Sequence, residues 1–154
     1  MIAAARLILA GLAPLLLLGA CNTAVDGSGA PARIEFRTVL ATGDVGQAGL
    51  QLRGEDGVTY LLGPADLDSS QVASAEATNE SGTWVVQVGL TPAGSAAFAD
   101  LTGRNVGKQI AIVVDGAVVS APTVQSAITG GIVQISGNFD RVTATRLADR
   151  IMGR

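Results

Sequence analysis

Asp115-Gly116 lies between two valine-rich runs, Ile110–Val114 and Ala117–Ser120. Both central residues of a type I′ turn need a positive φ angle, which glycine adopts freely and aspartate tolerates. The pair therefore predicts a tight β-hairpin with two antiparallel strands. Gly130-Gly131 indicates a second turn, after which Ile132–Ser136 is expected to form a third strand.

Four other segments have the composition of strands. Arg33–Leu40 alternates Ile34, Phe36 and Thr38 with charged residues, which is typical of a half-buried strand. Residues 41–57 are rich in glycine and are expected to form a loop. The strands expected outside the hairpin region are residues 33–40, 58–62, 72–78 and 84–90, and the second of them is expected to end at Gly63-Pro64.

Two segments have the signals of helices. Thr91-Pro92 is expected to begin the first, because threonine caps a helix and proline suits its first turn. Asp140 is expected to cap the second, whose apolar residues recur at helical spacing: Ala144, Leu147, Ala148 and Ile151. The order of strands and helices predicts an α+β fold, with a mostly antiparallel sheet and two helices packed on one face.

The N-terminus has the pattern of an export signal. Arg6 precedes an apolar run of 14 residues, Leu7–Ala20, which is shorter than the about 20 residues of a membrane-spanning helix. Leu18–Cys21 resembles a bacterial lipobox and ends in the only cysteine of the chain. We therefore expect residues 1–20 to be a lipoprotein signal peptide, Cys21 to receive a diacylglycerol, and residues 21–32 to form a flexible tether to a domain at residues 33–152.

Composition argues against several classes of function. With a formal net charge of −3 the chain is not basic enough to follow a phosphate backbone, so no nucleic-acid partner is expected. The chain has no histidine, the commonest general base and metal ligand, so no enzyme, cofactor or metal site is expected. Asp66 and Asp68 are too few to form a calcium loop, and we interpret them as solvated acids in a loop.

One stretch carries a family resemblance. Asn105–Pro122, followed by Ile128-Thr129-Gly130-Gly131 and Ile135–Phe139, resembles the head subdomain of the first large extracytoplasmic domain of SecD, the membrane protein that assists the Sec translocon. Tyr60–Pro64 and Trp84–Phe98 are also similar, so the resemblance covers most of residues 34–152 and is strongest over 58–152. These two stretches resemble the actinobacterial versions in particular.

The resemblance implies a narrower role than that of whole SecD proteins. SecD proteins have several transmembrane helices, whose charged residues serve proton movement, and no such helix is evident after Cys21. We therefore expect a lipid-anchored, stand-alone head module on the extracytoplasmic face of the cell membrane. The head of the family is thought to contact the translocating polypeptide, which makes exported polypeptides or Sec translocon components the expected partners.

A nearly uncharged connection is the candidate binding segment. The residues expected to contact an extended polypeptide are Ser120, Ala121, Pro122, Thr123, Val124, Gln125, Ile128, Thr129, Gly130 and Gly131. Proline cannot donate to a strand ladder, so Pro122 indicates a sheet edge. The alternative for the same segment is a connection that only packs against the domain. Two functions stay open: a binding lipoprotein that assists Sec-dependent export, and a structural or regulatory envelope lipoprotein that uses this fold for an unrelated ligand.

The lipid anchor gives a first prediction. The mature protein should begin at Cys21 and partition into detergent, because its acyl chains bury enough methylene groups for stable membrane attachment. Cys21→Ala should release the protein from the membrane or leave it unprocessed. Intact-mass spectrometry checks this, and an unmodified Cys21 in the wild-type protein would exclude the lipid anchor.

Overall fold

The computed structural model describes residues 31–40 and 49–154. The expected signal peptide, the expected acylation site at Cys21 and most of the expected tether lie outside the described residues, as do residues 41–48 of the expected loop. Ala32, at the end of the expected tether, belongs to the folded domain. It is buried, and its N–H donates to the carbonyl oxygen of Arg150 at 2.6 Å.

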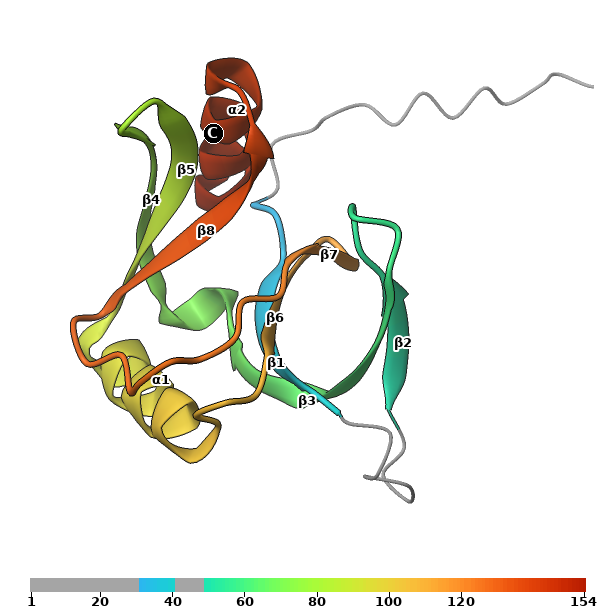
Figure 1. Cartoon of the computed structure of the whole chain (residues 1–154). Helices are drawn as coiled ribbons and strands as arrows, with labels where there is room; N and C mark the ends of the chain where they lie inside the picture. The colour runs from blue at the N-terminus through green and yellow to red at the C-terminus, as the bar shows by residue number, and fades with distance from the viewer. Residues whose placement is uncertain (1–30, 41–48) are drawn as a thin grey trace, which may run out of the picture.

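The first sheet has five strands that curl into a nearly closed ring (Figure 1). Its order is β2 (Leu50–Arg53), β3 (Thr59–Asp68), β1 (Ile34–Val39), β6 (Ile110–Val114) and β7 (Ala117–Ser120), and all neighbouring strands are antiparallel. The two edge strands meet again, because Gly54 forms a bridge with Val118 and the Glu55 N–H donates to the Val118 carbonyl oxygen at 3.1 Å. A small second core lies inside the curl, formed by Leu62, Ala111, Val113 and Val118.

The second sheet has three antiparallel strands, β4 (Val72–Glu80), β5 (Thr83–Leu90) and β8 (Ile132–Phe139). A short 3-10 helix, η1 (Ser69–Gln71), leads into β4. Helix α2 (Arg141–Met152) packs on β4 and β5 at the upper end of the view in Figure 1, and α1 (Pro92–Arg104) lies at the opposite end. Neither helix is long and apolar enough to cross a bilayer.

Both helices begin where the sequence predicts. The Thr91 side chain accepts a hydrogen bond from the Gly94 N–H at 3.1 Å, and the Asp140 carboxylate accepts one from the Thr143 N–H at 2.7 Å. These bonds satisfy N–H groups that have no partner within the first helical turn.

One main core joins the two sheets and both helices. Ile34, Phe36 and Ile112 enter it from the curled sheet, and Val86, Val88 and Ile135 from the three-stranded sheet. Phe98 of α1 and four residues of α2 complete it, namely Ala144, Leu147, Ala148 and Ile151. The rings of Phe36 and Phe98 meet edge to face, with centroids 5.4 Å apart. This core fixes how the two sheets lie relative to each other.

The α+β class is confirmed, and so is the hairpin: φ is +49° at Asp115 and +81° at Gly116. Three details differ from the prediction. The strands form two sheets, and Leu50–Arg53 is a strand within the expected loop. Strand β3 also continues through Gly63-Pro64, so Asp66 and Asp68 lie in a strand and not in a loop. Proline is tolerated there because the β1–β3 pairing shifts register between Val39–Leu62 and Arg37–Ala65, and bulges accept residues that cannot donate.

Candidate functional site

The first part of the candidate segment extends the hairpin pairing. The Ile110 N–H donates to the Pro122 carbonyl oxygen at 3.1 Å, and the Val124 N–H donates to the Lys108 carbonyl oxygen at 2.9 Å. The Gln109 side-chain amide donates to the carbonyl oxygen of Ala121 at 2.9 Å. Val124 is buried in the main core. Residues 120–124 are therefore held in place by the fold.

The second part of the segment lies over α1. The Ile128 N–H donates to the hydroxyl oxygen of Thr102 at 2.9 Å, and that buried hydroxyl donates to the Phe98 carbonyl oxygen at 2.7 Å. Gly131 has a φ angle of +67°, and a β-carbon there would come within 2.4 Å of the Ser95 hydroxyl oxygen. The backbone thus approaches the first turn of α1 more closely than a side chain would allow.

The ten candidate residues lie in one continuous stretch of the structure, but they differ in their exposure to solvent. Ser120, Ala121 and Gly131 are half-buried, and Val124 is buried. The exposed residues are Pro122, Thr123, Gln125, Ile128, Thr129 and Gly130. The alternative that the segment only packs against the domain therefore holds for the backbone of residues 120–124 and for the side chain of Val124. The exposed residues of the segment present their side chains to solvent.

A cleft of about 350 Å³ opens beside this segment. Its apolar lining comes from both sheets, from α1 and from the segment itself: Phe36, Phe98, Ile110, Ile112, Pro122, Val124, Ile128, Ile132 and Val133. The polar lining residues are Thr102, Thr123, Gln125, Ser126 and Gln134, and none of the lining residues is Asp, Glu, Lys or Arg. The cleft can take apolar side chains and offers hydrogen-bonding groups without charge.

Strand β8 forms one wall of the cleft and is an edge strand. Within the described residues it pairs only with β5, and Ile132–Gln134 line the cleft. Ile132 is 56% exposed, which is unusual for isoleucine in a sheet. An edge strand beside an apolar cleft is suited to pairing with another extended chain.

Residues from five separate parts of the sequence form this site, namely β1, α1, β6, the candidate segment and β8, and sequence reasoning identified only the segment. The sequence places Phe36 in a half-buried strand and Phe98 in the helix that follows Thr91-Pro92, and it places Ile132 and Gln134 in a strand; none of the four is indicated as part of a binding site. The alternation of residues 132–136 predicts a strand with one exposed side. It does not show that the exposed isoleucine would lie beside the candidate segment.

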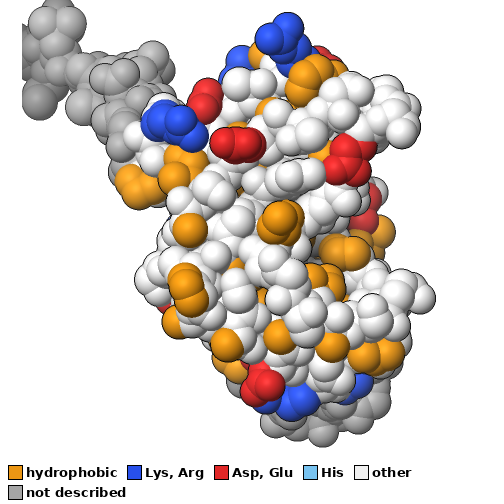
Figure 2. Space-filling view, turned by 90° about the vertical axis from the view of Figure 1, so that its left-hand side faces the viewer, with side chains coloured by type: hydrophobic (Ala, Val, Ile, Leu, Met, Phe, Trp, Pro, Cys, Tyr) orange, Lys and Arg blue, Asp and Glu red, His pale blue; other side chains and the backbone are white. Residues whose placement is uncertain are grey.

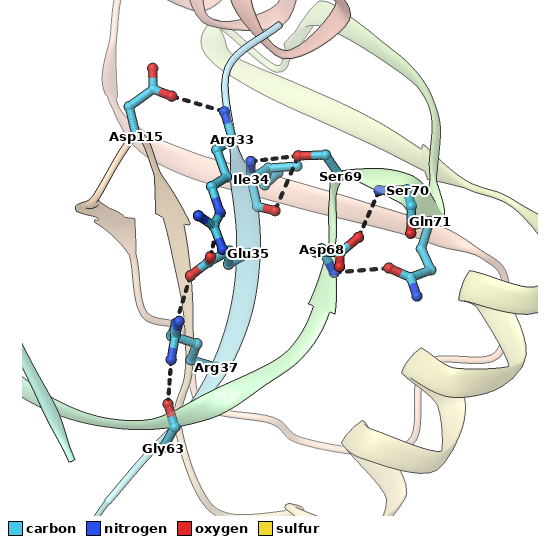
Figure 3. A network of polar contacts seen from close by, with 10 residues as sticks. All are labelled: Arg33, Ile34, Glu35, Arg37, Gly63, Asp68, Ser69, Ser70, Gln71 and Asp115. Carbon is cyan, nitrogen blue, oxygen red and sulfur yellow. Dashed lines mark hydrogen bonds and ion pairs between the residues drawn. The ribbon is translucent and has the colours of Figure 1, made fainter. Parts of the chain in front are cut away.

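No charged residue lines the cleft, although the Glu80 carboxylate accepts a hydrogen bond at 2.7 Å from the side-chain amide of Gln134, which does. On the face shown in Figure 2, apolar side chains are spread across the middle, and most charged side chains lie towards the upper and lower ends. On β1, Glu35 is buried inside the curl of the first sheet, although alternation predicted the solvent side (Figure 3). Arg33 and Arg37 each pair with it at 2.7 Å, and Arg37 also donates to the Gly63 carbonyl oxygen at 2.8 Å. This group has a structural role, because it holds β1 against β3.

Three carboxyl groups have a lowered pKa, and each has a local cause. Hydrogen bonding from the Tyr60 hydroxyl lowers the pKa of Asp56 and raises the pKa of Tyr60. Hydrogen bonding with Ser70 lowers the pKa of Asp68, and the Thr143 N–H lowers the pKa of Asp140. Their stabilising effect is present above the unfolded value of about 3.8 and is lost as the pH falls through the lower folded pKa. None of the four groups lines the cleft, so these shifts bear on the stability of the domain and not on binding in the cleft.

Comparison with known proteins identifies the family. Residues 32–152 match the family described as SecDF, P1 head subdomain. This chain belongs to the SecDF P1 head subdomain family. It is 42% identical over 100 residues to the protein translocase subunit SecD of Streptomyces coelicolor, a match that covers 60% of this chain and 18% of that one. With SecD of Acidaminococcus fermentans it is 46% identical over 99 residues, covering 64% of this chain and 22% of the relative.

Solved structures of SecDF also resemble this chain. A structure described as that of a membrane component SecDF that enhances protein export has a TM-score of 0.67 and 29% identity, and the match covers 84% of this chain and 66% of the other. The chain spans about a fifth of the length of the curated SecD relatives it matches. The shared family therefore relates this domain to the head subdomain of proteins described as protein translocase subunits.

Single substitutions at Val124 and Ile128 should separate packing from exposure. Val124→Asp should lower the free energy of unfolding by at least about 3 kcal/mol, because it removes a buried side chain and places a carboxylate in the core. Ile128→Asp should change it by less than about 1 kcal/mol, because Ile128 is 37% exposed. Urea denaturation followed by circular dichroism measures both. Equal losses would contradict the placement of the two side chains.

Proposed function

We propose that this protein is a membrane-anchored extracytoplasmic module that holds extended segments of exported polypeptides in the cleft between residues 120–131, α1 and β8. The observation that carries the proposal is the free edge of β8 beside an apolar, uncharged cleft. Membership of a family whose relatives are protein translocase subunits supports the choice of partner.

The chemistry of the cleft fits a partner with many different sequences. An exported chain that has not folded presents unpaired backbone N–H and C=O groups and alternating side chains, and an edge strand can pair with the former whatever the sequence. The cleft volume of about 350 Å³ accommodates one or two apolar side chains at a time. Such contacts give weak and short-lived binding, which allows the polypeptide to move on.

The uncharged lining also disfavours recognition of a partner through its charges. Charged partners gain little here, since long-range attraction needs charges near the site. The affinity should therefore change little between low and high salt. The module has no catalytic role in this proposal, and its action is to bind and release.

Membrane attachment is the second part of the proposal. Acylation of Cys21 would place the domain on the extracytoplasmic face of the membrane, where exported chains emerge. The nine residues from 22 to 30, which precede the folded domain, can span at most about 32 Å when fully extended. The cleft would then stay within reach of chains leaving a translocon in the same membrane.

Two exposed isoleucines provide the test of binding. Ile128→Asp together with Ile132→Asp should weaken binding of a fluorescently labelled, unfolded secretory polypeptide by at least about tenfold, since both carboxylates would lose water on binding. Fluorescence anisotropy at low and high salt gives the affinity. Circular dichroism should show that the double variant remains folded.

The matched control places the same charges outside the cleft. Val58 and Val106 are 50% and 53% exposed and do not line it, so Val58→Asp with Val106→Asp should bind like the wild-type protein. Equal loss in both double variants would show that net charge, and not the cleft, determines binding. A wild-type protein that binds a folded envelope protein but no unfolded chain would support the regulatory or structural alternative instead.

A further inference from the structure

The C-terminal helix concentrates the positive charge of an acidic protein. Residues 141–154 contain four arginines, Arg141, Arg146, Arg150 and Arg154, and only one acid, Asp149. The chain as a whole has a formal net charge of −3. The net charge of this one element is therefore opposite in sign to that of the rest of the protein. Its arginines are needed neither for the core nor for the cleft.

The arginines lie on the side of α2 that faces away from the core. Ala144, Leu147, Ala148 and Ile151 pack inward, while the outer surface is formed by Arg141, Val142, Thr145, Arg146, Asp149, Arg150 and Arg154. We call this outer surface the α2 face. Two of its arginines have partners: Arg150 pairs with Asp115, and Arg141 lies 6.0 Å from the ring centroid of Trp84. Arg146 and Arg154 form no ion pair with any other described residue.

Val142 adds an apolar group to the same surface. The residue is 62% exposed at the beginning of the helix, between Arg141 and the turn that holds Arg146. An exposed aliphatic side chain among arginines is typical of helices that lie at the boundary between lipid headgroups and water. Asp149, and Asp140 at the N-terminus of the helix, would be repelled by anionic headgroups. The four arginines outnumber these two acids, so the net charge of this part of the chain remains positive.

The chain enters the domain beside the α2 face. The Ala32 N–H donates to the carbonyl oxygen of Arg150, and a β-carbon on Gly153 would lie 3.2 Å from the Pro31 side chain. Figure 1 shows the first described residues next to α2, with α1 at the far end of the molecule. α2 is therefore the helix beside the point where the connection from Leu7–Ala20 and Cys21 joins the domain.

We propose that the α2 face binds an anionic membrane surface, with its arginines against lipid phosphates and Val142 at the headgroup boundary. Each arginine near such a surface raises the affinity about fivefold at physiological salt. The contact orients the domain, with α2 against the bilayer and α1 directed away from it. The orientation rests on the proposed membrane attachment, but the contact itself depends only on the charges of α2.

Trp84 is a built-in probe for this contact, because it is the only tryptophan and it lies beside Arg141. The full-length protein is reconstituted into vesicles that contain dansyl-labelled lipid, and energy transfer from Trp84 is measured. Transfer should be higher with phosphatidylcholine and phosphatidylglycerol than with phosphatidylcholine alone. It should fall to the neutral-vesicle value in about 1 M salt, where screening acts over roughly 3 Å.

Two charge-matched variants decide between the α2 face and net charge. Arg146→Ser with Arg154→Ser should remove the excess transfer with anionic vesicles. Arg104→Ser with Lys108→Ser removes the same charge at the α1 end and should retain the excess. Equal transfer in anionic and neutral vesicles, or equal loss in both variants, would overturn the proposal.

Flotation of the same vesicles measures whether the protein is anchored to the membrane, independently of the energy transfer. Wild-type protein that floats with neutral vesicles but shows no excess transfer on anionic ones has an anchor and no α2 contact, which overturns the proposal. The other outcome is wild-type protein that floats only with anionic vesicles, together with an Arg146→Ser, Arg154→Ser variant that does not float. That result would show that the protein lacks a lasting anchor, and it would support the α2 contact.

Discussion

The edge-to-face packing of Phe36 on Phe98 holds the two halves of this molecule together. Phe36 belongs to the centre of the curled sheet and Phe98 to α1, and around them the residues of the second sheet close a single core. The chain has only three phenylalanines, so few other side chains could fill this space. Truncation of either ring to alanine would be expected to cost about 3–5 kcal/mol, a large part of the stability of a small domain.

The same two rings connect stability with function. They lie beneath the segment 120–131 and line the proposed polypeptide cleft. The hydroxyl of Thr102, one turn after Phe98, receives the Ile128 N–H and so fixes the height of the segment above α1. The cleft is thus formed by the packing of rigid elements, and a partner would find it already shaped.

Local patterns predicted most of the elements, because their signals lie within a few residues. The Asp115-Gly116 turn and the caps at Thr91 and Asp140 depend only on backbone geometry and nearby N–H groups. Strand β2 was missed because Leu50–Arg53 is stabilised by pairing with β3 and not by its own composition. The burial of Glu35 follows from the curl of the sheet, and the cleft joins residues from 36 to 134, so neither can be inferred from spacing along the chain.

Site-specific photo-crosslinking in secreting cells tests the central claim most directly. A photoreactive residue at Ile132, beside the cleft, should form adducts with many different exported polypeptides while they are crossing the membrane, and the same residue at Val58 should form none. The adducts at position 132 should disappear when export is blocked before chains emerge. A single discrete envelope protein at position 132, or no adduct with any exported chain, would contradict the account.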